Sequence, residues 1–266
     1  IGMNMFDVQE KTWGYRYISK SAMDQYGFSS SADFGFGYKL KLKKFMLSTL
    51  LTNGEGYKKS GSDEFQKLSL QLLYGDSNLR SVQSGNAFNI GLALSIEPFS
   101  TEYSKWIDND DDFLTDNVDG DGYLDLEESL ETFDGINSAF SLFGGFTMQT
   151  FMGGLEINVL NSFDDQNFEI DFGGNGLEFG DDDTITTLST DGNIKTSSLI
   201  STYFSFGLTP KFNMFLRADI YDENIAADVE NDSETRVLLG FHFPISEHID
   251  LAPVIKYNSQ HFGFNI

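Results

Sequence analysis

Apolar and polar residues alternate with a period of two along most of this chain. Between Ala32 and Leu42, every second residue is apolar or aromatic, and Gly, Asp and Lys stand between them. This period is typical of β-strands, whose successive side chains point to opposite faces of a sheet. The pattern therefore predicts an all-β fold of about 12 or more antiparallel strands. The segments that carry it are 13–18, 32–42, 45–52, 68–74, 88–96, 140–148, 151–159, 200–208, 214–220, 237–243, 251–257 and 262–266.

The polar faces of these strands carry charged side chains among Gly, Ser, Asn and Ala. In a soluble sandwich the apolar face is buried, whereas in an outer-membrane barrel the apolar face meets lipid and the polar face lines the lumen. The period alone does not separate these two folds. If the fold is a barrel, the residues expected to line its pore are Arg16, Asp33, Lys39, Lys41, Glu156, Arg217, Asp219, Arg236, His242 and Lys256.

The connections between the expected strands favour the barrel. Most of them alternate between short turns, such as 43–44 and 149–150, and long polar segments, such as 100–134 and 163–194. Bacterial outer-membrane barrels have short turns at one rim and long loops at the other. Trp and Tyr residues also gather near the expected strand ends, as in the aromatic belts of membrane proteins. We therefore expect residues 1–266 to form a single transmembrane antiparallel β-barrel domain with long acidic surface loops.

A resemblance to a known family supports this expectation. The stretches that carry it are Lys11–Tyr17, Ser19-Lys20, Asp24, Tyr26–Phe28, Ser30–Asp33 and Asn53–Lys58. They resemble bacterial outer-membrane porins of the phosphate-selective porin-like group over about 50 residues. The resemblance implies a diffusion or solute-selective channel in the bacterial outer membrane, built from roughly sixteen strands. Phosphate selectivity is not expected, because the chain has 17 basic residues against 41 acidic ones.

The segment 100–134 contains a twelve-residue window that matches an EF-hand calcium loop. Oxygen-bearing side chains stand at positions 1, 3, 5, 9 and 12 of the window, and Gly122 stands at position 6. Calcium prefers six to eight hard oxygen ligands, which alternate residues of a tight loop can supply. The window therefore predicts a bound calcium ion in a surface loop. Its expected ligands are Asn117, Asp119, Asp121, the backbone carbonyl of Tyr123, Asp125 and Glu128.

Composition excludes several other classes of protein. The chain has no Cys, so a disulfide framework is excluded, and its net charge of -24 argues against nucleic-acid binding. The three His residues are dispersed and no Ser lies in a nucleophile elbow, so we expect no enzymatic activity. The chain begins at Ile1 without Met, which suggests a mature or truncated product of an exported precursor.

The function expected from the sequence is a porin-like channel for passive diffusion of small solutes or ions. Its surroundings would be outer-membrane lipid, and a homo-oligomer or a surface protein partner remains open. One alternative is a non-conducting outer-membrane barrel that serves as a structural or docking protein. Another is a secreted, calcium-stabilised β-sandwich.

Overall fold

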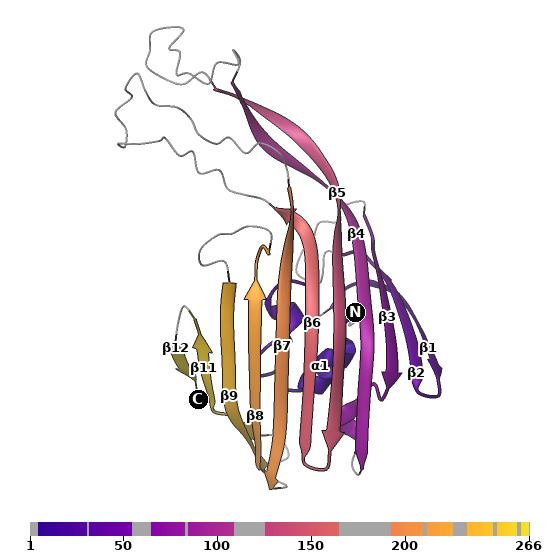
Figure 1. Cartoon of the computed structure of the whole chain (residues 1–266), viewed down its shortest axis with the longest axis vertical. Helices are drawn as coiled ribbons and strands as arrows, with labels where there is room; N and C mark the ends of the chain where they lie inside the picture. The colour runs from indigo at the N-terminus through magenta and orange to yellow at the C-terminus, as the bar shows by residue number, and fades with distance from the viewer. Residues whose placement is uncertain are drawn as a thin grey trace. The chain divides into compact units, whose positions relative to one another are not determined.

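The computed structural model of the chain describes residues 5–30, 32–54, 65–82, 85–108, 126–164, 193–209, 212–225, 233–246, 249–259 and 262–265. Most of these residues belong to one large sheet, and its strands follow one another in chain order (Figure 1). The strands are β1 (Gly35–Leu42), β2 (Phe45–Thr52), β3 (Lys67–Gly75), β4 (Asn86–Asp108), β5 (Leu126–Met148), β6 (Phe151–Asp164), β7 (Asn193–Thr209), β8 (Phe212–Asp222), β9 (Ser233–Ser246), β10 (Ile249–Leu251), β11 (Val254–Asn258) and β12 (Phe262–Asn265). The large antiparallel sheet predicted from the period of two is thus confirmed.

Two tight hairpins also agree with the sequence. Leu42 pairs with Phe45 around the turn 43–44, and Met148 pairs with Phe151 around the turn 149–150. Lys43 and Gln149 adopt positive φ angles of 55° and 51°, as the first central residue of a two-residue type I′ or II′ hairpin turn does. The expected strand 251–257 is interrupted at Ala252 and Pro253, so that β10 and β11 are separate.

The expected strand at 13–18 is wrong. Residues Asp7–Trp13 form the helix α1, and Gly14 ends it with a φ of 68°, donating its N–H to the carbonyl of Glu10 at 2.8 Å. Residues 16–18 form a turn, and Ala22–Gln25 form the short helix α2. The alternation of Trp13, Tyr15 and Tyr17 imitates a strand, but the three rings do not share a face, because Trp13 and Tyr15 are buried in one core whereas Tyr17 is 61% exposed.

The sheet is not closed into a barrel. β1 and β12 lie at the two ends of the strand order, and no pairing joins them in the part of the chain that the structure describes. The coarser prediction of an all-β, antiparallel fold therefore holds, whereas the closed barrel is not observed.

The chain divides into two compact units. The first, here called the sheet unit, comprises residues 1–98, 136–162 and 195–266, and the second, here called the loop unit, comprises residues 99–135 and 163–194. The loop unit nearly coincides with the two longest acidic loops expected from the sequence. The loop expected at 100–134 is shorter than predicted, because β4 runs to Asp108 and β5 begins at Leu126. Within the loop unit, the ring of Phe163 lies 5.8 Å from that of Phe99 and 5.3 Å from that of Phe133.

In the sheet unit, residues 5–30, here called the N-terminal segment, pack against one face of the sheet. We call this the inner face, and Figure 1 shows α1 lying against it. Two clusters of buried side chains join the segment to the strands. Phe6, Val8 and Met23 pack with residues such as Leu73 and Phe143, whereas Trp13 and Tyr15 pack with Tyr203, Phe215 and Leu238. The core of this unit therefore lies between the segment and the inner face.

The opposite, outer face of the sheet is apolar and exposed. Along β3 and along residues 88–96 of β4 the outward residues are Leu, Ile, Tyr or Phe, whereas the inward residues between them, such as Ser69, Gln71 and Asn89, are buried. The same alternation continues through β5, β6, β7 and β8. The outward residues with more than a third of their surface exposed include Leu70, Leu72, Ile90, Leu92, Leu94, Phe140, Leu142, Leu155, Ile157, Ile200, Phe204, Leu216 and Ile220.

Candidate functional site at the inner face of the sheet

Arg217 of β8 is the centre of a buried charged cluster. Its Nε donates to Oδ1 of Asp219 at 2.8 Å, and its Nη2 lies 2.7 Å from Oδ2 of the same carboxylate. Ser201 of β7 donates its hydroxyl to Oδ1 of Asp219 at 2.6 Å. Both charged side chains are almost completely buried, with exposed fractions of 1% and 0%. A two-point contact of this kind compensates in part for the loss of hydration that burial imposes on both ions.

The same guanidinium group also holds the N-terminal segment. Its Nη1 donates to the backbone carbonyl of Lys20, and its carbon lies 5.2 Å from the centre of the Trp13 ring. A cation over an aromatic face is attracted by the negative potential of the ring, more strongly when water is excluded. Glu156 of β6 is buried nearby and interacts electrostatically with Arg217 and Asp219. The cluster thus joins the wall of the sheet to the segment that covers it.

Arg80 forms a second attachment, at the C-terminus of α1. It lies in the 3-10 turn η1 (Leu79–Ser81) and donates to the backbone carbonyls of Thr12 and Trp13, at 3.3 Å and 2.5 Å. The last carbonyls of a helix have no partner within it, and they carry a partial negative charge that favours a cation. The guanidinium group also lies 4.4 Å from the centre of the Tyr15 ring. Arg80 therefore caps α1 from the sheet side.

Three further strands bind the segment through side-chain hydrogen bonds. Gln71 of β3 donates to the carbonyl of Met5 at 2.7 Å, and Gln9 donates to the hydroxyl of Ser141 in β5 at 3.3 Å. The hydroxyls of Tyr15 and Ser205, in β7, lie 2.8 Å apart. The attachments therefore come from strands that are distant in the sequence.

Tyr26, at the end of α2, forms a further attachment of the N-terminal segment to the sheet. Its ring stacks on that of Tyr221 with centroids 4.6 Å apart, and its hydroxyl lies 3.5 Å from Oε1 of Glu234. Burial, reinforced by the nearby carboxylates of Asp219 and Glu234, raises the pKa of Tyr26 above its ordinary value. The hydroxyl therefore keeps its proton and remains a hydrogen-bond donor to Glu234.

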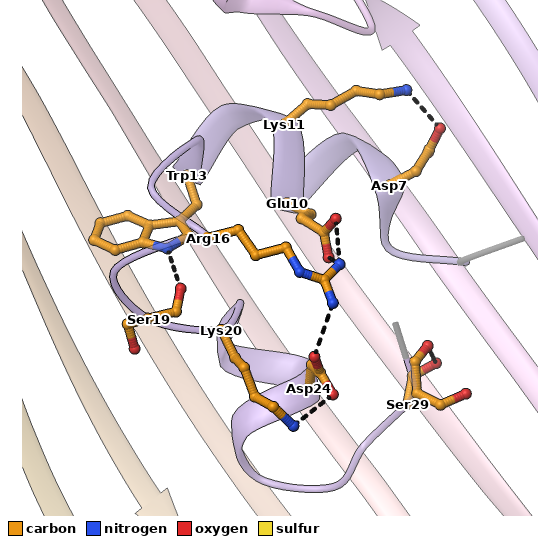
Figure 2. A network of polar contacts seen from close by, with 10 residues as sticks. Asp7, Glu10, Lys11, Trp13, Arg16, Ser19, Lys20, Asp24 and Ser29 are labelled. Carbon is orange, nitrogen blue, oxygen red and sulfur yellow. Dashed lines mark hydrogen bonds and ion pairs between the residues drawn. The ribbon is translucent and has the colours of Figure 1, made fainter. Parts of the chain in front are cut away.

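Within the N-terminal segment itself, exposed ion pairs join α1 to α2 (Figure 2). Arg16 lies 2.8 Å from Glu10 and 3.6 Å from Asp24, and Lys20 lies 3.2 Å from the same Asp24 carboxylate. The indole of Trp13 donates to the carbonyl of Ser19 at 2.9 Å. Exposed ion pairs contribute little to stability individually. This network therefore orders the turn between α1 and α2 and does not attach the N-terminal segment to the sheet.

Gly14 is required where the helix turns toward Arg80. Its φ of 68° is one that residues with a Cβ adopt only at a cost, and a Cβ built there would lie 1.8 Å from Nε of Arg80. We expect Gly14→Ala to destabilise the protein by about 1–2 kcal/mol from the backbone alone, with a further loss from displacement of Arg80. Urea unfolding should show this effect, whereas Gly27→Ala, with a φ of 76° and no atom near its Cβ, should lose only the backbone contribution. Equal losses would contradict the role of Arg80.

The residues predicted to line a pore fall into different environments. Glu156, Arg217 and Asp219 are buried together, whereas Arg236 and Lys256 lie half-buried on the inner face. Arg16 belongs to the N-terminal segment and not to a strand. Asp33 precedes β1 and accepts hydrogen bonds from the N–H groups of Phe34 and Gly54.

The other predicted pore residues lie near the ends of the strand order. Lys39 and Lys41 are exposed on β1, and Lys39 pairs with Asp7 of α1 at 3.3 Å. His242 of β9 lies 3.2 Å from Asp250 and beside the rings of Tyr15 and Tyr17, about 6.2 and 6.1 Å away. The structure thus brings Glu156, Arg217 and Asp219 together, places Arg236 of β9 opposite Asp219 in the strand pairing, and leaves the other predicted residues apart.

Sequence reasoning missed the residues that attach the segment to the sheet. Arg80 lay in a connection between strands, and Gln71 and Ser141 were ordinary polar positions of the alternating pattern. The available signal was that Arg80 is the one basic residue in the connection 75–86, which also carries Asp76. The partners of Arg80, Gln71 and Ser141 are backbone carbonyls and Gln9 of the N-terminal segment. Residues 13–18 of that segment were predicted as a strand.

The predicted calcium ligands lie largely outside the described residues. Asn117, Asp119, Asp121, Tyr123 and Asp125 are not described, and Glu128 lies in β5. β5 already begins at Leu126, so the last three residues of the window belong to a strand. Among the described residues, no group of three or more His, Cys, Asp or Glu side chains is placed to hold a metal ion. Calcium binding therefore stays a prediction.

Comparisons with known proteins identified no relative of this chain. A scan against protein-family models and searches of curated proteins and solved structures gave no match to the chain. Separately, none of the helices in the described residues is long and apolar enough to cross a membrane.

Proposed function

We propose that this chain forms the wall of a porin-like barrel in the bacterial outer membrane, and that its N-terminal segment controls passage through it. The observation that carries the proposal is the polarity of the sheet. Its covered inner face carries buried charged and polar side chains, such as Arg217 and Asn158, among apolar ones such as Phe143, and its uncovered outer face is apolar over at least six strands. An uncovered apolar face is the reverse of what a soluble sheet shows, and it matches a wall that faces lipid on its outer side.

The aromatic residues of the outer face are consistent with a membrane boundary. Phe45, Tyr74 and Phe88 form a row in which neighbouring ring centres are 4.8 and 5.8 Å apart. All three stand near strand ends at the side of the short turns, where a girdle of aromatic rings is expected at the headgroup level.

The packed N-terminal segment favours a closed state. Its buried side chains fill the space over the inner face, and Arg217, Asp219 and Glu156 are inaccessible to solvent beneath it. Passage of a solute along this wall therefore requires the segment to move. A barrel whose segment never moves would instead be a non-conducting structural or docking protein, and the same packing favours this second candidate.

Conductance in planar bilayers tests the proposal. The protein is purified in detergent, and wild type is compared with a variant that lacks two attachments, Gln71→Leu/Arg80→Met. We expect brief or small openings from wild type and at least a tenfold higher open probability from the variant. Lys11→Met, which removes only the exposed pair with Asp7, serves as the control and should behave as wild type. Silence of both proteins would favour the non-conducting barrel, and a steadily open wild type would contradict closure by the segment.

For calcium, we expect micromolar to millimolar binding at the window 117–128, the range of EF-hand sensors and extracellular modules. Glu128→Gln removes one of the two oxygens that a bidentate ligand supplies, and it should weaken binding at least tenfold. Isothermal titration of both proteins with Ca²⁺ measures the difference. Asp182→Asn, in an acidic run without ligand spacing, is the matched control. Equal titration curves for wild type and Glu128→Gln would exclude Glu128 as a ligand.

A further inference from the structure

β1 is an edge strand, and two of its outward side chains are more exposed than the outward leucines of β3, although its Leu40 is only 36% exposed. Phe36 and Tyr38 are 83% and 61% exposed, whereas Leu70 and Leu72 of β3, which lie between two strands, are 36% and 47% exposed. Within the described part of the chain, β1 is paired on one side only, with β2, over eight residues from Gly35 to Leu42. The excess exposure is therefore the area that another strand on the free side of β1 would cover.

The other face of β1 is basic. Lys39 and Lys41 alternate with the outward apolar residues, and both are exposed. Lys39 pairs with Asp7, with half of its side-chain surface still exposed, and no carboxylate of the described residues lies within ion-pair distance of Lys41. A strand placed against this edge would bring its own alternate side chains directly opposite these lysines.

We propose that the free edge of β1 binds an antiparallel strand in which apolar residues alternate with acidic ones. The apolar residues would cover Phe36 and Tyr38, and the carboxylates would lie beside Lys39 and Lys41. Opposite charges across a strand pair are favourable and like charges are unfavourable. The antiparallel direction follows from the sheet, in which the described pairings are antiparallel.

Two other occupants fit this edge less well. A second copy of β1 has no acidic residue between Gly35 and Leu42 to place opposite these lysines. β12, at the other end of the sheet, has only four residues, Phe262–Asn265, none of them acidic, against the eight of β1. The inference goes beyond the proposed function, because it concerns the edge of the sheet and holds whether or not the protein conducts.

Binding of synthetic peptides tests the proposal on the full-length folded protein. The first probe is a fluorescein-labelled nine-residue peptide in which Glu alternates with Leu and Phe, and the second replaces every Glu with Lys. Fluorescence anisotropy should show that the Glu peptide binds at least tenfold more tightly than the Lys peptide. The variant Lys39→Glu/Lys41→Glu should reverse this preference, and Lys39→Gln/Lys41→Gln should abolish it if the first variant folds poorly. Lys43→Glu/Lys44→Glu, in the adjacent turn, should change it less than twofold.

Two results would overturn the proposal. One is equal binding of the two peptides, or no binding of either, which would make the lysines simply protective charges on an exposed edge. The other is an efficient cross-link within one chain between Tyr38→Cys and Phe264→Cys, which would show that β12 occupies the edge. The chain has no natural Cys, so such a cross-link is unambiguous. Neither result depends on conductance, so failure of this proposal and failure of the channel proposal are distinguishable.

Discussion

Arg217→Met is expected to lower the free energy of unfolding by about 3–5 kcal/mol, because it leaves Asp219 as a buried carboxylate without its ionic partner. Asp219 would keep only the hydroxyl of Ser201 among its hydrogen-bond donors in the described part of the chain. The same change removes the donor to the carbonyl of Lys20 and the cation over Trp13. Urea unfolding in lipid vesicles, followed by tryptophan fluorescence, measures the loss, since Trp13 lies at the cluster.

The double variant Arg217→Met/Asp219→Leu separates the unpaired charge from the lost attachment. Because the orphaned carboxylate is gone, it should recover a large part of the stability that the single variant loses. Lys256→Met, on the same inner face but only half-buried, is the control and should cost less than about 1 kcal/mol. If Arg217→Met also costs less than about 1 kcal/mol, the buried pair of Arg217 and Asp219 is not what stabilises the N-terminal segment.

Leu92→Arg has the second-largest expected effect, and it tests the membrane directly. Leu92 lies in the middle of the outward apolar row of β4, where it pairs with Leu72 of β3. An arginine facing lipid near the centre of a bilayer costs about 2–4 kcal/mol, because its charge loses hydration. The cost should appear as reduced folding into lipid vesicles and as a lower free energy of unfolding from them.

Leu92→Ala is the matched control for this substitution, since it removes the same side chain without adding a charge. In a soluble protein the 42% exposed Leu92 would tolerate Arg within about 0.5 kcal/mol, and the protein would remain monodisperse without detergent. Detergent-free solubility together with an unaffected Leu92→Arg variant would therefore overturn the assignment to the outer membrane.

The strands could be predicted because the alternation of apolar and polar residues along each strand shows which of its side chains lie on the apolar face of the sheet. β2 was predicted with its observed bounds, and the turns at 43–44 and 149–150 were predicted because two polar residues there separate two apolar runs. By contrast, the stretch from Trp13 to Ile18 imitates a strand through Trp13, Tyr15 and Tyr17. Only the packing of Trp13 against Phe215 and Tyr203 shows that these rings belong to a segment that covers the sheet.

The candidate site was partly predictable for the same reason. Glu156, Arg217 and Asp219 could be assigned to the polar face, because that assignment depends only on the alternation of their own strands. Their meeting depends on the register, which pairs Ser201 with Asp219 and Tyr203 with Arg217 across β7 and β8. The burial of Arg217 depends on Trp13 and on Lys20, which lies 197 positions earlier in the chain.

The sequence by itself determined the period of two, and with it an antiparallel sheet with one apolar and one polar face. It determined this because the alternation is a local property of each strand, written in consecutive residues. Only the tertiary structure decided that the polar face is covered by the N-terminal segment, that Arg80 and Arg217 attach that segment, and that the free edge of β1 is unpaired in the described chain. These features arise from contacts between residues far apart in the chain, and no local pattern of residues specifies which distant groups will meet.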